Sequence, residues 1–347
     1  MKPPFRADQV GSLLRPSWLA QSRKDRPLQD KAILEAIRKQ EAVGLESITD
    51  GEFRRDWWHL DFLTQIEGVA ARVNPGPKFG GTEEQPPIPI VTGKLRYAKP
   101  IMIDDFLFLR TNTKKTAKYT IPSPSMLHLR AGRAGIAYED MEEFWSDAAA
   151  VYRDAIAAFA RAGCTYLQLD DVAFAYLCDP KIREACVKHG DDPVKLPARY
   201  AQTIRESLRD KPKNMVVAMH TCRGNFKSAW VAEGGYEPVA EAMFASGVDA
   251  FFMEFDSERA GSFEPLRFVP KGKKVVLGIV SSKTGSLEEK SFLRRRIDEA
   301  AKFVPLEDLC LSPQCGFSST HHGNQLTQEE QWQKLERVVQ TAKEVWQ

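Results

Sequence analysis

The chain has 347 residues, 43% of them hydrophobic, which is enough for one large α/β barrel or two smaller domains. Its 49 Lys and Arg against 47 Asp and Glu give a net charge of +2, and the basic run Arg294–Arg296 is typical of a solvated helix face. These features argue against a nucleic-acid partner. No stretch approaches the ~18 apolar residues that span a bilayer, and residues 1–12 do not resemble a signal peptide. We therefore predict a soluble, cytoplasmic protein.

Six cysteines are scattered along the chain, at positions 164, 178, 186, 222, 310 and 315. This spacing argues against a disulfide framework in a chain of this length. The thiols are then expected to be reduced and available as metal ligands.

Short apolar or β-branched runs alternate with segments of helical periodicity, which predicts βα units and a parallel sheet of the (β/α)8 TIM-barrel class. In chain order the candidate strands end in ADQVGS, LESITDGE, PIVTGKL, KYTIPSP, TYLQLDD, VVAMHTC, AFFMEFD, KVVLGIVSS and LCLSPQCG. These are nine candidates, one more than an eight-stranded barrel needs. We expect one of them to lie outside the barrel.

Between the strands, residues 138–163 predict a helix that begins acidic, has apolar residues at helical spacing and ends at Gly163. The pairs Ser286 with Glu289 and Thr327 with Glu330 form capping boxes that predict two further helix starts. A Pro- and Gly-rich excursion at about 73–100 is predicted to be irregular, as a loop over the active-site mouth or as a peripheral arm. No internal repeat or linker is visible, so residues 1–347 are expected to form a single catalytic domain.

Polar residues with catalytic or metal-binding potential recur where the predicted strands end. In a parallel α/β barrel the carboxyl ends of the strands form the active site, so these side chains are expected to converge on one pocket. The residues are Ser12, Glu52, Asp170, His220, Cys222, Glu254 and Cys315.

Four of these residues, His220, Cys222, Glu254 and Cys315, together offer one nitrogen, two sulfurs and one oxygen. That set suits zinc better than magnesium or calcium, because thiolates are soft ligands. The ligands come from three separate strand ends, whereas structural zinc sites usually gather theirs in tight local pairs. Each residue alone has an ordinary explanation, Cys315 as a packed cysteine and Glu254 as a surface ion-pair partner. The joint placement favours a catalytic zinc ion.

Two thiolates, a carboxylate and a neutral imidazole would leave the zinc centre negatively charged, which makes it a poor Lewis acid for hydrolysis. Such a centre suits a substrate thiol, which it binds as thiolate while preserving the nucleophilicity of the sulfur. The chemistry predicted from the residues is attack by a zinc-bound thiolate on an alkyl group.

The other polar residues carry less specific signals. Glu52 is either a buried ion-pair partner of Arg54 or Arg55, or one of two carboxylates, with Asp170, that clasp a substrate ammonium group. Asp170 and Asp171 are adjacent in a strand and must point in opposite directions, so they form no acid/base pair.

Two pairs of rings near the predicted site are ambiguous. Trp57 and Trp58 are interpreted as packing residues, with stacking on a flat pterin or corrin as the alternative. His321 and His322 are interpreted as exposed loop residues, although the loop after Cys315 could bring them to the pocket.

At this level the chain resembles the C-terminal catalytic barrel of the cobalamin-independent methionine synthase family, and most of all its short single-barrel relatives. The shared motifs run nearly end to end: Gly11-Ser12, DGEF (50–53), LQLDD (167–171), HTC (220–222), MEF (253–255) and SPQCG (312–316). The resemblance implies a TIM barrel of the uroporphyrinogen decarboxylase and methionine synthase type. It also implies the activity of a 5-methyltetrahydropteroyltriglutamate–homocysteine methyltransferase in methionine biosynthesis.

The resemblance also implies roles for single residues. The family binds zinc through His, Cys, Glu and Cys at the motifs that hold His220, Cys222, Glu254 and Cys315. By the same comparison, Glu52 and Asp170 hold the homocysteine amino group, and Ser12 contacts the carboxylate end.

The chain departs from the long enzymes in ways that leave the methyl donor and the acid open. Those enzymes are double barrels whose N-terminal half helps to hold polyglutamyl folate, and the sequence printed here has no such half. Their histidine-bearing loop corresponds to residues 278–289, which contain no histidine, so Ser281, Ser282 or Lys283 would have to replace it. The donor stays open: the candidates are methyltetrahydrofolate and methylcobalamin, the latter carried by a corrinoid protein, or another methyl donor.

Three functions remain in view. The first is zinc-dependent methyl transfer to homocysteine, which forms methionine. The second is zinc-thiolate alkyl transfer with another thiol or electrophile, such as epoxide opening by coenzyme M. The third is a noncatalytic barrel stabilised by zinc, or a metal-free relative of uroporphyrinogen decarboxylase.

Overall fold

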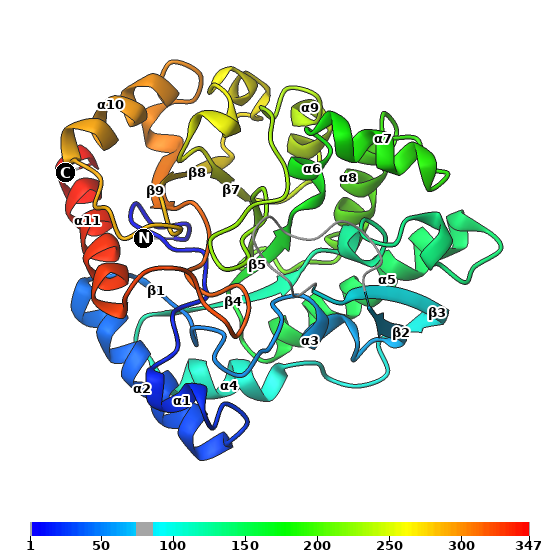
Figure 1. The fold of residues 1–347 in the computed structure, drawn as a ribbon, viewed down its shortest axis with the longest axis horizontal. Helices are drawn as coiled ribbons and strands as arrows, with labels where there is room; N and C mark the ends of the chain where they lie inside the picture. Colours follow the sequence, from blue (N-terminus) through cyan, green and yellow to red (C-terminus); the bar gives the residue numbers. More distant parts are fainter. Residues whose placement is uncertain (1, 74–85, 347) are drawn as a thin grey trace.

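A computed structural model describes residues 2–73 and 86–346. Its centre is a parallel sheet in which seven named strands pair in the order β1-β4-β5-β6-β7-β8-β9, surrounded by helices (Figure 1). The strands are β1 (Ser47–Ile48), β4 (Thr116–Pro122), β5 (Tyr166–Asp171), β6 (Val216–Thr221), β7 (Ala250–Glu254), β8 (Lys274–Val280) and β9 (Leu309–Pro313).

The N-terminal segment occupies the eighth position and closes the sheet into a barrel. On one side Ala7 bridges Leu311 of β9 in parallel, with a hydrogen bond of 2.9 Å from Asp8 N to the Leu311 carbonyl. On the other side Ser12 bridges Gly51, just beyond β1. The predicted (β/α)8 barrel is therefore confirmed, with its first strand reduced to isolated bridges.

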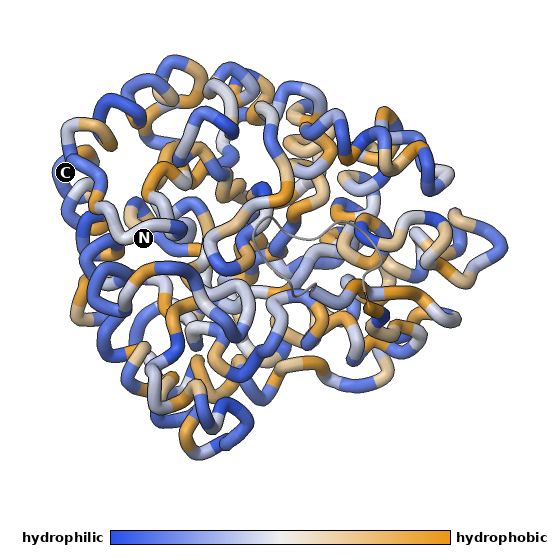
Figure 2. The backbone as a smooth tube through the Cα atoms, viewed as in Figure 1, coloured by the Kyte–Doolittle hydropathy of each residue, from blue (hydrophilic) through white to orange (hydrophobic). Residues whose placement is uncertain are grey.

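Apolar side chains fill both faces of the barrel wall, which explains why the strands read as continuous apolar runs. One buried cluster, which includes Val10, Tyr166, Phe252 and Val276, lies inside the barrel. A larger cluster fills the space between the sheet and the helices. Figure 2 shows the hydrophobic segments gathered toward the centre and the hydrophilic ones along the outer helices.

Helices cover the outside of the barrel. The predicted helix at 138–163 is α5, which begins after the N-cap Asp140, whose side chain accepts from Glu142 N at 2.8 Å. The longer helices are α2 (Arg26–Val43), α4 (Ile103–Asn112), α5 (Met141–Arg161), α8 (Leu196–Ser207), α10 (Lys290–Ala300) and α11 (Gln328–Trp346). The shorter ones are α1 (Ser17–Ala20), α3 (Leu60–Leu63), α6 (Ala173–Tyr176), α7 (Pro180–Lys188) and α9 (Ala240–Phe244). Five 3-10 turns lie at Pro124–Leu127, Arg133–Gly135, Glu258–Ala260, Glu264–Phe268 and Leu306–Asp308.

The two predicted capping boxes differ in outcome. At the start of α11, Thr327 N donates to Glu330 Oε2 at 2.7 Å and Glu330 N donates to Thr327 Oγ1 at 3.2 Å, so this box is confirmed. The box at Ser286 and Glu289 is wrong, because α10 begins only at Lys290, with Glu289 as its N-cap and no capping hydrogen bond from that side chain.

One of the nine predicted strands lies outside the barrel, as expected. It is β3 (Ile88–Arg96), which pairs antiparallel with β2 (Glu67–Arg72) in a separate two-stranded sheet. The excursion expected to be irregular at about 73–100 therefore contains a regular strand, because apolar residues of β3 such as Ile88, Val91 and Leu95 are buried. Residues 74–85 of that excursion lie outside the described residues.

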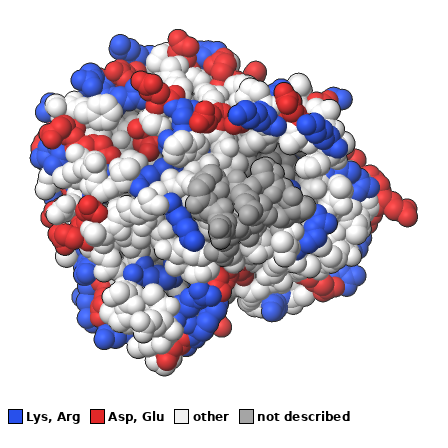
Figure 3. Space-filling model, in the orientation of Figure 1, with Lys and Arg blue, Asp and Glu red and all other residues white. Residues whose placement is uncertain are grey.

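Charges of both signs are interspersed over the face seen in Figure 3, which agrees with the near-balanced composition. Among the described residues, no helix combines the length and apolar character needed to cross a membrane.

Candidate active site

Parallel pairing brings the ends of β5 and β6 side by side, because Asp170 is the register partner of His220. His220 Nδ1 lies 3.1 Å from Asp170 Oδ1, and both side chains are buried. An N–H at Nδ1 that donates to this carboxylate leaves Nε2 as the nitrogen for a metal, and in this structure Nε2 lies 3.2 Å from the Gln314 carbonyl oxygen, to which it donates. Carboxylate–imidazole pairs of this kind orient metal-binding histidines in proteins.

Two predicted sulfur ligands meet beside this imidazole. Cys222 Sγ, just after β6, lies 3.7 Å from Cys315 Sγ, just after β9. One donor atom from each of His220, Cys222 and Cys315 lies within 4.8 Å of the others. Two sulfurs bound to one tetrahedral zinc at ~2.3 Å would be about 3.8 Å apart. The spacing and chemistry of these three residues therefore fit zinc.

The protonation of this cluster is that of a site prepared for a cation. The hydrogen bond between the two sulfurs lowers the pKa of Cys315 and raises that of Cys222, so one thiol and one thiolate share a proton. Although burial opposes it, the neighbouring Asp170 and Cys315 raise the pKa of His220 to about 10. A bound divalent metal would replace these protons.

The fourth predicted ligand, Glu254, lies outside this three-residue cluster. Its fully buried carboxylate accepts from Arg259 Nη2 at 2.8 Å and from Arg223 N at 2.5 Å. Arg259 also lies 3.1 Å from Asp256 Oδ1. The carboxylate of Glu254 is thus already neutralised by a guanidinium group.

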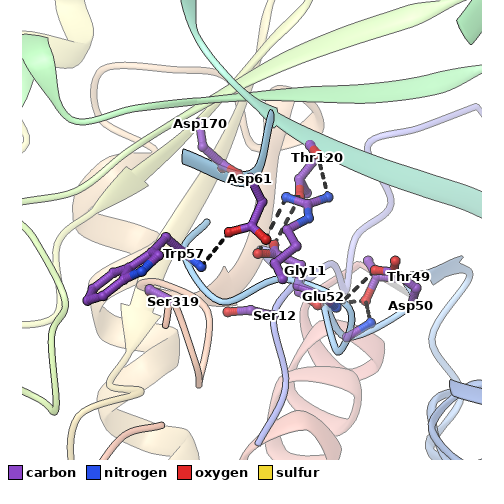
Figure 4. Close-up of polar contacts among 12 residues, drawn as sticks. Gly11, Ser12, Thr49, Asp50, Glu52, Trp57, Asp61, Thr120, Asp170 and Ser319 are labelled. Carbon is purple, nitrogen blue, oxygen red and sulfur yellow. Dashed lines mark hydrogen bonds and ion pairs between the residues drawn. The ribbon is translucent and has the colours of Figure 1, made fainter. Parts of the chain in front are cut away.

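Glu52 occupies a strained position at the other side of the pocket. Its backbone has φ of 60°, a left-handed conformation that non-glycine residues rarely adopt outside functional sites. Its carboxylate accepts from Thr120 Oγ1 at 2.9 Å and lies 3.5 Å from Arg55 Nη1, contacts drawn in Figure 4. The ion pair predicted as an alternative is therefore present with Arg55, whereas Arg54 pairs with Asp30 and Asp105.

Burial is the main cause that raises the pKa of Glu52 to about 7, and the nearby Asp170 adds to it while Arg55 opposes it. Asp170 lines the same pocket. Glu52 and Asp170 are two buried carboxylates on one pocket, and like charges in one site favour the arrival of a further cation. This arrangement fits an ammonium group.

Ser12 lies on the segment that closes the barrel, and its hydroxyl accepts from Ser318 N at 3.3 Å. The Gly316 backbone packs directly against it, since a Cβ at position 316 would lie 1.9 Å from Ser12 Oγ. This close approach explains the glycine of the SPQCG motif. It brings the loop that carries Cys315 against the loop that carries Ser12.

One pocket collects most of the predicted residues. Trp57 and Trp58 are both half-buried and line its wall, and Trp58 also packs against the hydrophobic core. Asp170 and Asp171 diverge as predicted, since Asp171 accepts from Ser123, Ser125 and two backbone N–H groups of α6. The lining includes Ser12, Glu52, Asp170, His220, Cys222 and Cys315, together with His59, Arg130 and Tyr176.

His59, Arg130 and Tyr176 were missed from the sequence. His59 follows the two tryptophans, Arg130 lies in a loop after β4, and Tyr176 ends α6; none stands directly at the end of a strand. The WWH run, three rings in a row after DGEF, was the available signal for His59.

Several residues considered from the sequence do not line the pocket. His321 and His322 are half-buried rather than exposed, and their rings contact Trp57 at centroid distances of 5.7 and 5.9 Å. Ser281, Ser282 and Lys283 are also absent from the lining, and Lys283 Nζ instead donates to the Gly224 carbonyl at 2.9 Å.

Comparison with known proteins agrees with this geometry. The family model described as cobalamin-independent synthase, catalytic domain, matches residues 15–344. The uncharacterized protein YxjH of Bacillus subtilis is 44% identical over 99% of this chain and 96% of its own length. A methionine synthase of Pyrococcus abyssi is 25% identical over 89% of this chain and 85% of its own length.

Among solved structures, a candidate vitamin-B12-independent methionine synthase from Listeria monocytogenes superposes with a TM-score of 0.81 at 38% identity, covering 100% of this chain and 99% of that one. A B12-independent methionine synthase from Shewanella, in complex with selenomethionine, shares the fold with a TM-score of 0.76 at 20% identity, covering 98% of this chain and 97% of that one. The chain belongs to the cobalamin-independent methionine synthase family, as a catalytic-domain barrel.

Proposed function

We propose that this protein is a zinc-dependent methyltransferase that transfers a methyl group to homocysteine and forms methionine. The observation that carries the proposal is the pair of sulfurs 3.7 Å apart beside His220, in a pocket that also contains Glu52 and Asp170. A soft metal site next to buried carboxylates fits a substrate that has a thiol at one end and an ammonium group at the other.

In this proposal His220, Cys222 and Cys315 hold the zinc ion, which binds the substrate sulfur as thiolate when present. Glu254 completes the predicted ligand set, in competition with its ion pair to Arg259. Glu52 and Asp170 orient the substrate through its ammonium group, and Ser12 contacts its carboxylate. The methyl donor is methyltetrahydrofolate or methylcobalamin, and the enzyme is expected in the cytoplasm.

Two alternatives make different demands on these residues. Alkyl transfer with a thiol that has no amino group, such as coenzyme M, does not need an ammonium clasp. In a noncatalytic barrel, zinc would have no substrate ligand. Calorimetry with Glu52→Gln tests the first alternative. An unchanged homocysteine dissociation constant would contradict the proposal that Glu52 binds the substrate ammonium group. X-ray absorption of the zinc protein with and without homocysteine tests the second, because a third sulfur appears only if the thiol binds the metal.

The direct test is an assay of the zinc-loaded protein with homocysteine and, in separate reactions, methyltetrahydrofolate, its polyglutamate and methylcobalamin. Methionine in any of them is the expected result. Zinc and homocysteine both bound, with no methionine from any donor, would contradict the proposed methyl transfer and favour another electrophile.

A further inference from the structure

The pocket contains polar groups that neither the metal nor the amino acid uses. They are His59, Arg130, Asp171 and Tyr176, which lie on its wall together with the metal cluster. A methyl donor must reach the same sulfur, so these groups are the ones that can meet the donor. A donor with a basic leaving group would need a proton from one of them.

His59 is held as a neutral acceptor. Burial, together with the charge of Arg130, lowers the pKa of His59 to about 3, and its imidazole donates to the Pro87 backbone carbonyl. Its Nδ1 is buried and has no hydrogen-bond partner among the described residues. A ring whose N–H is already used and whose other nitrogen is a bare lone pair accepts hydrogen bonds and supplies no proton.

Asp171 and the loop after β8 are excluded by their contacts. The Asp171 carboxylate accepts from two serine hydroxyls and two backbone N–H groups, which hold it as an acceptor. Lys283, the cation that the sequence offered in place of the family's loop histidine, donates to the Gly224 carbonyl and does not line the pocket.

Tyr176 has the opposite arrangement. Its hydroxyl oxygen accepts from Arg130 Nη2 at 3.2 Å, and the guanidinium carbon lies 5.2 Å from the centre of the ring. Its own proton has no acceptor among the described residues. The hydroxyl also lies close to the backbone that follows Cys222, since a Cβ at Gly224 would be 2.8 Å from Tyr176 Oη.

We propose that Tyr176, supported by Arg130, is the acid that protonates the leaving nitrogen of an N-methyl donor. This inference rests on the proposed methyl transfer and commits it to a donor whose methyl group is bonded to nitrogen. A cobalt leaving group departs with its electron pair and needs no proton. A nitrogen that departs with the N–CH3 electron pair is strongly basic, so it needs an acid in the pocket.

The substrate thiolate forms an S–CH3 bond while the N–CH3 bond breaks and its electron pair stays on nitrogen. The phenol proton of Tyr176 moves to that nitrogen, which leaves a secondary amine. The phenolate is stabilised by the Arg130 guanidinium and regains its proton from water. Burial is the main cause that raises the pKa of Tyr176 to about 12, which keeps the phenol protonated before the reaction.

The test compares Tyr176→Phe with the wild-type zinc protein, using methyltetrahydrofolate and methylcobalamin as donors in single turnovers with homocysteine. The expected result is a rate that falls about 10²- to 10⁴-fold with methyltetrahydrofolate, the range typical of a lost general acid. With methylcobalamin, any rate present in the wild type is expected to be kept within about threefold, since no proton is required. Zinc content and the homocysteine dissociation constant are expected to stay unchanged.

Tyr152→Phe is the matched control, because the Tyr152 hydroxyl is buried without a partner among the described residues and does not line the pocket. It is expected to retain the wild-type rate. An unchanged rate for Tyr176→Phe with methyltetrahydrofolate, or an equal loss with both donors, would overturn the assignment while leaving the methyl transfer intact. A wild type that uses only methylcobalamin would overturn it as well. Methionine from neither donor would contradict the proposed function itself.

Discussion

Both ends of the barrel interior hold buried charged side chains. At one end these groups pair with one another, whereas at the other end some buried polar atoms have no partner among the described residues. At the N-terminal end, Asp8 and Lys118 are fully buried and 3.2 Å apart. Lys118 also donates to the Gln9 carbonyl and lies 3.9 Å from the centre of the Phe252 ring. The Asp8 carboxylate accepts from the backbone N–H groups of Phe5 and Gln9 and from the side chains of Ser47, Lys118 and Tyr166.

At the carboxyl end of the strands the buried polar groups are less fully paired. His59 Nδ1 and Asn225 Oδ1 line the pocket without a partner among the described residues, and two sulfurs share one proton. Buried polar groups that satisfy one another stabilise a fold, whereas groups left unsatisfied await a ligand. The difference separates the structural network from the functional one, although both consist of polar residues in the same barrel.

The largest expected effect is on zinc affinity, when a sulfur ligand at the carboxyl end of the barrel is removed. Cys222→Ser should lower zinc affinity by more than the roughly 100-fold that loss of an outer contact can cost, because it removes a ligand itself. Zinc competition with a chromophoric chelator measures this. Cys186→Ser, in α7 and away from the pocket, is the control and should keep wild-type affinity. Equal zinc binding by both variants would contradict the metal site.

Breaking the Asp8–Lys118 pair at the N-terminal end should lower the stability of the fold and leave zinc affinity unchanged. Lys118→Met leaves Asp8 as a buried charge without its cation, which is expected to lower the free energy of unfolding by about 3–5 kcal/mol. Denaturant unfolding measures the loss. Zinc affinity of the fraction that remains folded should be unchanged, and a parallel loss of zinc would show that the two ends are coupled.

Asp170→Asn tests the carboxylate that orients His220. The asparagine can still accept from Nδ1–H but lacks the negative charge, so zinc affinity is expected to fall about 10- to 100-fold. The same chelator competition measures it. If the loss equalled that of Cys222→Ser, Asp170 would have to act as a ligand rather than through the imidazole.

The smallest expected effect is a pH dependence. Because burial raises the pKa of Glu52 to about 7, the carboxylate is neutral below that pH and loses its attraction for an ammonium group. Homocysteine affinity should therefore fall as pH drops from 8 to 6, by up to about tenfold per unit below the pKa.

Titration calorimetry measures this dependence. 3-Mercaptopropionate, which has the thiol but no amine, corrects for ionisation of the thiol and the metal site. The excess pH dependence of homocysteine should disappear in Glu52→Gln. If it persisted there, Glu52 would not be the group responsible.

The barrel was predictable because its signals are local. Each strand is a short apolar run, and parallel strands must bring their carboxyl ends to one edge, so His220, Cys222 and Cys315 could be placed together without knowing the helices between them. The helix at 138–163 followed from its periodicity and its acidic start. The excursion was described less accurately: PIVTGKL was predicted as a strand, but the surrounding Pro and Gly residues led to the whole of 73–100 being predicted irregular, although it contains β3.

The sequence could not show which side chains pair with one another. Arg259 follows three acidic residues, Glu254, Asp256 and Glu258, and nothing in that spacing indicates that it binds the first two. Asp170 lies near the end of β5, whereas Tyr176 is the last residue of α6, so its position in the pocket depends on how α6 packs. Such contacts depend on side-chain direction in three dimensions, which a linear pattern does not encode.

The short distance between the two sulfurs has a consequence for the lifetime of the enzyme. When the metal is lost, a thiolate at Cys315 lies 3.7 Å from the sulfur of Cys222. Thiolates are the forms that oxidants attack first, and a neighbouring thiol then resolves the product into a disulfide. A bound metal occupies both sulfurs and so protects them. Under the proposed function, methionine formation would then stop under oxidative stress or zinc shortage, and reductant followed by zinc would restore it.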